Sequence, residues 1–251
     1  MKNARIKEKN IAIDPHSVAS FFHDRAEKFN PQHPLTAVLY QDNNPALAEE
    51  RDAYEKQVAL PLLKLTGKES LLDIGCGIGR WAHLLHHKVK YYMGIDFSQG
   101  LIAIAKQQIR ASNVAFFTAS AEELGCAEVK LHAPFDRILI AGLLIYLNDD
   151  QIMALLNDIR KIVAKDCLIY LREPIALEER LTLNQFWSEE LSANYSAIYR
   201  TENDLKTLIN QTLGDLILTP IKFVPLYKDN ALNNRNETKQ FYAMLHLGNT
   251  D

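Results

Sequence analysis

Three shortages in the 251-residue sequence limit what this protein can be. It has only 3 cysteines, and Cys76, Cys126 and Cys167 form no CxxC pair, so they predict neither a disulfide framework nor a zinc knot. No apolar run approaches the roughly 20 residues that cross a bilayer, and the N-terminus lacks the apolar core of a signal peptide. We therefore expect a cytoplasmic protein in a reducing compartment, with no membrane partner.

The sequence also lacks a large excess of either positive or negative charge. The 28 basic and 31 acidic residues give a formal net charge of -3. This balance argues against a protein whose main task is to grip a phosphate backbone, so nucleic acid is a disfavoured partner. The basic first ten residues are interpreted as a solvated, disordered tip. The length suits one large domain, because a chain of this size can bury most of its apolar surface.

Short apolar runs alternate with amphipathic stretches from Ser70 onward. The runs predict strands over 71–74, 91–96, 114–118, 135–141 and 167–171. Helical spacing between them predicts helices that begin at Trp81 or extend over 101–110 and 152–163. Such alternation is typical of an α/β fold with a doubly wound parallel sheet. Two later runs, 216–224 and 240–247, predict an antiparallel pair near the end of the chain.

Two segments lie outside this alternation. Residues 1–66 contain scattered prolines followed by a predicted helix over 46–65, and we expect an N-terminal helical arm that caps the domain formed by 67–251. Residues 174–214 are rich in acids and aromatics and are expected to form a lid over a substrate. Within this lid, Thr201 begins a capping-box pattern that predicts a helix ending at Gly214.

The glycine-rich stretch DIGCGIGR, at 73–80, follows the first predicted strand. Glycines at such a turn let the backbone approach a ligand and aim amide groups at it. Arg80 stands where a dinucleotide fingerprint wants a third Gly or Ala, and the Asp73 carboxylate would repel a pyrophosphate but accept from an ammonium. Asp96 ends the next strand, where a ribose offers two hydroxyls. A bare turn, with Asp96 and Ser98 as helix caps and Arg80 solvated, is the alternative.

The segments LLDIGCGIGRW, MGIDFS and TASAEEL resemble the cofactor motifs of class I S-adenosylmethionine-dependent methyltransferases of the small-molecule type. The resemblance covers residues 70–174 best. It implies a Rossmann-like, seven-stranded sheet with an antiparallel final strand. It also implies S-adenosyl-L-methionine as cofactor and S-adenosyl-L-homocysteine as product.

The resemblance also implies roles for single residues. Gly75 and Gly77 would pack under the methionine and ribose parts, Asp73 would face the amino group, and Asp96 would hold the ribose hydroxyls. Phe97 would lie against adenine. Arg80 matches a GxGR variant found in protein amino-terminal methyltransferases and is the candidate partner of the cofactor carboxylate. The remaining members of the expected cofactor site are Cys76, Ser98, Ser120, Ala121 and Glu122.

The fourth predicted strand runs into Ala-Gly-Leu-Leu-Ile-Tyr at 141–146. It has neither the [DN]PP[YF] clamp of base-amine and glutamine methyltransferases nor an aspartate to hold a divalent metal, so we expect no metal site. The candidate catalytic residues are Glu173, Tyr146 and the possible base His23. The candidate substrate contacts are Arg172, Tyr195, Tyr199, Arg200 and Tyr40, and ordinary packing or salt bridges are the alternative for each.

These observations favour an enzyme that transfers a methyl group to oxygen or nitrogen of a small-molecule acceptor by in-line displacement. A peptide or protein amino-group N-methyltransferase is the alternative suggested by GIGR, and it predicts an acidic, open channel. A non-catalytic S-adenosylmethionine-binding module is a third hypothesis. The sequence leaves a monomer and a homodimer equally open.

Overall fold

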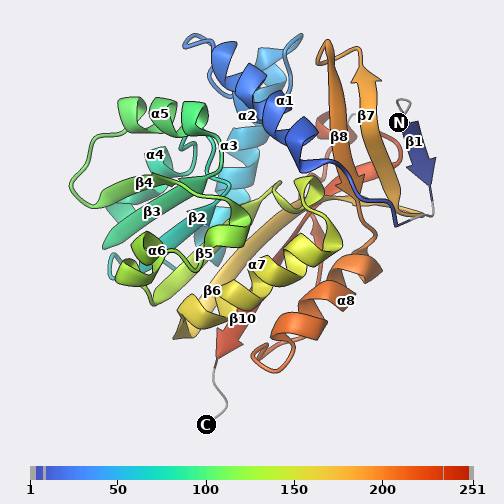
Figure 1. The fold of residues 1–251 in the computed structure, drawn as a ribbon. Coiled ribbons are helices and arrows are strands. Elements are labelled where there is room, and N and C mark those ends of the chain that lie inside the picture. Colours follow the sequence, from blue (N-terminus) through green and yellow to red (C-terminus); the bar gives the residue numbers. More distant parts are fainter. Residues whose placement is uncertain (1–3, 8–9, 234, 249–251) are drawn as a thin grey trace.

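The computed structural model describes residues 4–7, 10–233 and 235–248. Its main strands are β2 Ser70–Ile74, β3 Tyr91–Asp96, β4 Val114–Thr118, β5 Phe135–Ala141, β6 Val163–Ala176, β9 Val224–Pro225 and β10 Thr238–Gly248. They form a seven-stranded sheet with the spatial order β4-β3-β2-β5-β6-β10-β9 (Figure 1). The strands from β4 to β6 are parallel, whereas β10 runs antiparallel to both β6 and β9. The predicted doubly wound, Rossmann-like α/β fold is confirmed.

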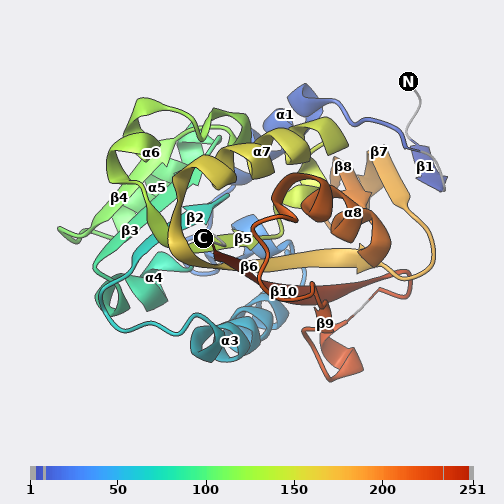
Figure 2. The same ribbon diagram turned by 90° about the horizontal axis from the view of Figure 1, so that it is seen from below.

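Helices cover both faces of this sheet (Figure 2). One face is covered by α3 Pro45–Leu62, α4 Ala82–Leu85 and α5 Gln99–Gln108, and the other by α6 Ala127–His132, α7 Asp149–Ile162 and α8 Glu202–Leu213. Successive strand residues point to opposite faces, so Leu71 joins the core under α3 to α5 while Leu72 joins the core under α6 to α8. Burial on both faces explains why the parallel strands are continuously apolar.

Several boundaries follow from local chemistry. The Thr201 Oγ1 accepts from the Asp204 amide at 3.2 Å, and the Asp204 carboxylate accepts from the Thr201 amide at 3.0 Å. This reciprocal cap fixes the start of α8 as predicted, and the helix stops before Gly214. The 216–224 run, by contrast, gives only an isolated bridge at Ile217 and the short β9. Pro220 and Pro225 lack the N–H groups that a longer strand would need.

The lid contains a second sheet that the sequence did not predict. β7 Leu181–Ser188 and β8 Ala193–Tyr199 form an antiparallel hairpin, and β1 Ala4–Lys7 adds to its edge (Figure 1). The expectation of a disordered tip is therefore wrong for residues 4–7. In the arm, α1 Pro15–Glu27 and α2 Thr36–Leu39 share an apolar core with this hairpin, which includes Phe21, Phe22 and Tyr195. Arm and hairpin together roof the carboxyl ends of the parallel strands.

The remaining elements are short 3-10 turns: η1 His86–Lys88, η2 Ala121–Glu123, η3 Leu144–Tyr146 and η4 Asn230–Leu232. Of the helices in the described residues, none is both long enough and apolar enough to span a bilayer.

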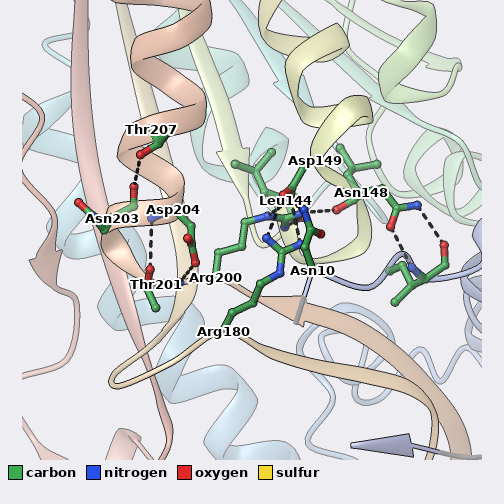
Figure 3. A network of polar contacts seen from close by, with 12 residues as sticks. Asn10, Leu144, Asn148, Asp149, Arg180, Arg200, Thr201, Asn203, Asp204 and Thr207 are labelled. Atoms are coloured by element: carbon green, nitrogen blue, oxygen red, sulfur yellow. Dashed lines mark hydrogen bonds and ion pairs between the residues drawn. The ribbon is translucent and has the colours of Figure 1, made fainter. Parts of the chain in front are cut away.

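A network of arginines joins the lid to the start of α7 (Figure 3). Arg200, at the end of β8, donates to Asp149 at 2.7 Å and to the carbonyls of Leu144 and Leu147 at 2.8 and 2.7 Å. Arg180 donates to both oxygens of Asp149, at 2.9 and 3.0 Å. Partial burial favours the neutral acid, but the hydrogen bonds from Arg180 and the charge of Arg200 lower the pKa of Asp149. We call Asp149, Arg180 and Arg200 the arginine clamp.

The substitution Arg200→Gln is expected to lower the free energy of unfolding by about 3 kcal/mol, because it leaves two carbonyls and part of the Asp149 charge without a donor. Equilibrium urea unfolding measures this loss. The control is Lys161→Gln, which removes an exposed 2.7 Å pair with Asp158 and should cost less than about 1 kcal/mol. Equal losses in the two variants would show that the clamp is worth no more than a surface ion pair.

Candidate functional site

A cavity of about 410 Å³ lies at the carboxyl edge of the parallel strands, beneath the arm and the lid. This volume falls within the roughly 300–1,000 Å³ typical of small-molecule sites. Its floor comes from the loops that follow β2, β3, β4 and β5, and its roof from α1, α2 and β8. Ligands of doubly wound sheets bind at this edge. The fold therefore places the glycine-rich motif in the wall of this cavity.

The glycine turn needs glycine for two separate reasons. Gly75 and Gly77 have φ angles of 74° and 54°, in the left-handed region that other residues avoid. A Cβ at Gly77 would also lie 2.8 Å from Val38 Cγ1 in the arm, and one at Gly75 would lie 3.2 Å from Leu143 Cδ1. Side chains here would fill the space between the turn and the roof. The turn thus leaves backbone exposed to the cavity.

Asp96 lies in the cavity wall at the end of β3 and is 8% exposed. Its two oxygens each accept one backbone bond, from the Gly77 and Ser98 amides, both at 2.9 Å. Burial raises the pKa of Asp96 to about 6. Each carboxylate oxygen keeps a further lone pair, so Asp96 can accept two hydrogen bonds from a ligand. Ser98 is not in the wall; its Oγ caps α5 by accepting from the Leu101 amide at 3.3 Å.

Asp73 lies one layer behind the wall. Its carboxylate is 1% exposed and accepts a short hydrogen bond from the Tyr92 hydroxyl. Burial raises the pKa of Asp73 to about 7, so a cation in the cavity would favour its ionised form. Cys76 does lie in the wall, and burial raises the pKa of its thiol well above the ordinary value. The thiol is neutral and acts as a small filler between the glycines.

Arg80 is held from behind by α3. Its Nη1 lies 2.8 Å from Asp52 and its Nη2 lies 2.9 Å from Glu55. Glu55 also accepts from Arg172 Nε at 2.9 Å. Burial favours the neutral acid, but the two arginines lower the pKa of Glu55 below its ordinary value. Asp52, Glu55, Arg80 and Arg172 form what we call the buried ion cluster, and both arginines reach the cavity wall.

Three tyrosine hydroxyls meet inside the cavity, from α2, η3 and β8. The Tyr146 hydroxyl donates to Tyr40 at 2.9 Å and lies 2.9 Å from the Tyr195 hydroxyl. Because Tyr146 has one proton and donates it to Tyr40, Tyr195 must donate to Tyr146. The proton of Tyr40 is then left for an acceptor in the cavity. Burial raises the pKa of all three phenols, so this tyrosine triad is neutral near pH 7.

Other predicted cofactor contacts also reach the wall. Phe97, Ser120 and Ala121 line the cavity, and the Phe97 ring stands edge-on to Phe22 with ring centres 5.5 Å apart. The Glu122 side chain lies outside the described residues. Tyr199 lines the cavity as well, and its hydroxyl accepts from Arg235 Nη1 at 2.7 Å. Within the described chain, no group of three or more His, Cys, Asp or Glu side chains is placed to hold a metal ion.

Three predicted residues lie elsewhere. Glu173 is absent from the described wall: its Oε1 accepts from the Leu143 and Leu144 amides, each at 2.9 Å, and burial raises its pKa to about 7. It shapes the loop after β5. Arg200, a predicted substrate contact, donates instead to Asp149 and to the carbonyls of Leu144 and Leu147, and it is absent from the described wall.

His23, the predicted base, lies on the exposed side of α1. His23 is 71% exposed, pairs with Glu27 at 3.5 Å and does not line the cavity. The histidine of α1 that does line the cavity is His16, two helical turns earlier. The hydrophobic face of α1 could be read from the sequence, but its position relative to the cavity could not.

Comparisons with known proteins agree with this geometry. Residues 71–166 match the family described as a methyltransferase domain. The chain is 34% identical over 85 residues to the 23S rRNA (uracil(1939)-C(5))-methyltransferase RlmD of Aliivibrio fischeri, and this match spans 33% of the chain and 19% of the relative. It is 22% identical over 147 residues to a probable S-adenosylmethionine-dependent methyltransferase, CRG1, of Saccharomyces cerevisiae, covering 57% and 50% of the two chains. The chain thus spans between a fifth and a half of these curated relatives.

Solved structures share the fold over a longer stretch. A Leishmania major SAM-dependent methyltransferase aligns with a TM-score of 0.66 at 17% identity, covering 94% of this chain and 87% of the other. The phosphoethanolamine N-methyltransferase 1 of Haemonchus contortus aligns with a TM-score of 0.68 at 17% identity, covering 94% and 49%. Residues 71–166 thus match the methyltransferase-domain family, and nearly the whole chain shares the fold of these solved methyltransferases.

The substitution Gly77→Ala is expected to lower the free energy of unfolding by about 2–4 kcal/mol, because a strained φ and a clash with Val38 add together. Gly67→Ala is the control: its φ of 90° is also positive, but a Cβ there meets nothing within 4 Å. It should cost only the strain, about 1 kcal/mol. Adding Val38→Ala to Gly77→Ala should recover the difference. Denaturant unfolding that gives equal losses for both glycines would refute the close contact.

Proposed function

We propose that this protein transfers the methyl group of S-adenosylmethionine to oxygen or nitrogen of a small-molecule acceptor. The proposal rests on the observation that the expected cofactor residues and the tyrosine triad line the same cavity. The bare glycine turn and the Asp96 carboxylate lie on its floor, and the tyrosine triad joins Tyr146, from the loop after β5, to Tyr40 and Tyr195 of the roof. A cofactor held on the floor would present its methyl group toward the roof.

The floor fits the parts of the cofactor. Gly75 and Gly77 leave the room that a Cβ would fill, and Asp96 keeps lone pairs for two ribose hydroxyls. Phe97 offers a flat apolar surface to adenine. We assign Asp73 to the positive end of the cofactor, acting through its charge from behind the wall, and Arg80 to the carboxylate, with the N–H groups that the buried ion cluster leaves unused.

The cofactor supplies an already activated methyl group, so the protein's own task is to position the acceptor and to exclude water. The Tyr40 hydroxyl can donate to the acceptor molecule and fix its orientation, while Tyr146 and Tyr195 hold Tyr40 in place. Neutral phenols do not remove protons. The proposed acceptors are therefore groups that reach the cavity as free amines or as oxygen anions.

A peptide amino-terminus fits this cavity less well. It carries a positive charge and would need the acidic channel that the GxGR alternative predicts. The ionised groups of the described wall are mostly basic, with Asp96 as their acid. We also propose that residues 1–66 act as the cap of the domain formed by 67–251, with 174–214 as the substrate lid.

The substitution Asp96→Ala is expected to weaken binding of S-adenosylhomocysteine by about 1–3 kcal/mol, because hydrogen bonds from the ribose to a charged acceptor are lost. Calorimetric titration measures the affinity. The matched control is Asp150→Ala, which removes an exposed carboxylate of α7 outside the cavity wall. Unchanged affinity in Asp96→Ala would defeat the ribose assignment.

The substitution Tyr40→Phe is expected to lower kcat/KM for methyl transfer about tenfold, the effect of one lost hydrogen bond of about 1.4 kcal/mol. Transfer of radiolabelled methyl groups to a panel of small phenols and amines measures it. Affinity for S-adenosylhomocysteine should stay unchanged. Tyr54→Phe, which lies outside the cavity wall and contacts Tyr227, is the control. A Tyr40→Phe enzyme as active as wild type would remove the triad from the mechanism.

A further inference from the structure

The cavity wall carries an excess of positive charge that the cofactor does not explain. Its one described carboxylate is Asp96, on the floor. Its basic side chains, apart from the histidine on α1, are Arg51, Arg80, Arg172, Arg235 and Lys239. S-adenosylmethionine has a single carboxylate to offer against its own two positive centres. The remaining positive charge in the cavity wall therefore favours the binding of a second anion.

This excess of positive charge is not distributed evenly over the cavity wall. Arg80 and Arg172 are neutralised from behind by Asp52 and Glu55 at 2.8 to 2.9 Å. Arg235 differs: its Nη1 donates to the neutral hydroxyl of Tyr199, and the carboxylate of Glu190 lies 3.8 Å from its Nη2.

Lys239 also lines the cavity. Among the described side chains, no carboxylate lies within 4.0 Å of its amine. The residue is half-buried on β10, opposite Ile175 at the end of β6. Two cations with weak or absent counter-charges thus occupy the side of the cavity formed by β8, β10 and the segment before β10.

This side is also where a second hollow meets the first. A cavity of about 330 Å³ beneath the lid shares four wall residues with the main one: Tyr195, Tyr199, Arg235 and Thr238. Tyr195 belongs to the tyrosine triad and lines both cavities, as does Arg235. A molecule that spans them would touch both.

We propose that Arg235 and Lys239 form a subsite for an anionic group, a carboxylate or a phosphate, on the methyl acceptor. The subsite binds the far end of the substrate and leaves its nucleophilic atom at the tyrosine triad. The inference rests on the proposed function and narrows the substrate class to small anionic molecules. Arg235 offers a planar pair of N–H donors to such an anion, and its partial exposure keeps the cost of desolvation low.

The test uses inorganic phosphate and benzoate as probes, titrated calorimetrically into the full chain saturated with S-adenosylhomocysteine, with neutral benzamide as reference. At least one anion is expected to bind saturably, and benzamide should bind more weakly than benzoate. The double variant Arg235→Gln/Lys239→Gln is expected to lose at least about tenfold in anion affinity. Its affinity for S-adenosylhomocysteine should remain that of wild type. The matched double variant Arg110→Gln/Lys90→Gln removes two exposed charges away from the wall and should change neither.

Two results would overturn the subsite: neither anion binds, or anion binding survives in Arg235→Gln/Lys239→Gln. Comparison of the benzoate and phosphate titrations also shows whether the subsite prefers a carboxylate or a phosphate. Failure of S-adenosylhomocysteine to bind the wild-type chain would instead defeat the proposed function, and the two failures are thereby distinguished.

Discussion

The interaction on which the site depends most is the one that Glu55 makes with two arginines. Glu55 is 1% exposed and lies between Arg80, which follows the glycine turn, and Arg172, at the end of β6. A single carboxylate thus joins α3 to two strand ends that are far apart in the sequence. Removing one member of such a group leaves an uncompensated buried charge, which is far more costly than losing a surface pair. The positions of both arginines in the cavity wall follow from this constraint.

Burial makes ionisation unfavourable for two carboxyl groups of this site, those of Asp73 and Asp96, as long as no ligand is bound. Burial raises the pKa of Asp73 to about 7 and that of Asp96 to about 6. Between the ordinary pKa of an aspartate and these values, the folded chain holds protons that the unfolded chain has released, so rising pH reduces stability over this interval. A ligand with positive charge would favour the ionised forms and offset that loss.

The sequence was most informative where local pattern and tertiary role coincide. The limits predicted for β3, β4 and β5 match those of the structure, because each strand is a short apolar run that ends at a polar or small residue. The turn between β7 and β8 carries no such signal. Ser192 adopts a positive φ in the turn without glycine, and so does Gln185 within β7, where the pairing shifts register between Leu183 and Phe186. The hairpin was therefore missed.

Side-chain roles were harder to predict, because they depend on partners distant in the sequence. Asp52 and Glu55 look like the solvated face of a helix until Arg80 and Arg172 are placed beside them. Arg200 looks like a ligand contact, but the carbonyls of Leu144 and Leu147 take its donors.

The edge strand β1 has one more consequence. It pairs residues 4–7 with β7, while α1 packs on β8. The arm and the hairpin are therefore joined at two places. The arm and the hairpin could therefore leave the main sheet only together. Any opening of the roof would have to move both elements at once and would also break the hydrogen bonds of the arginine clamp.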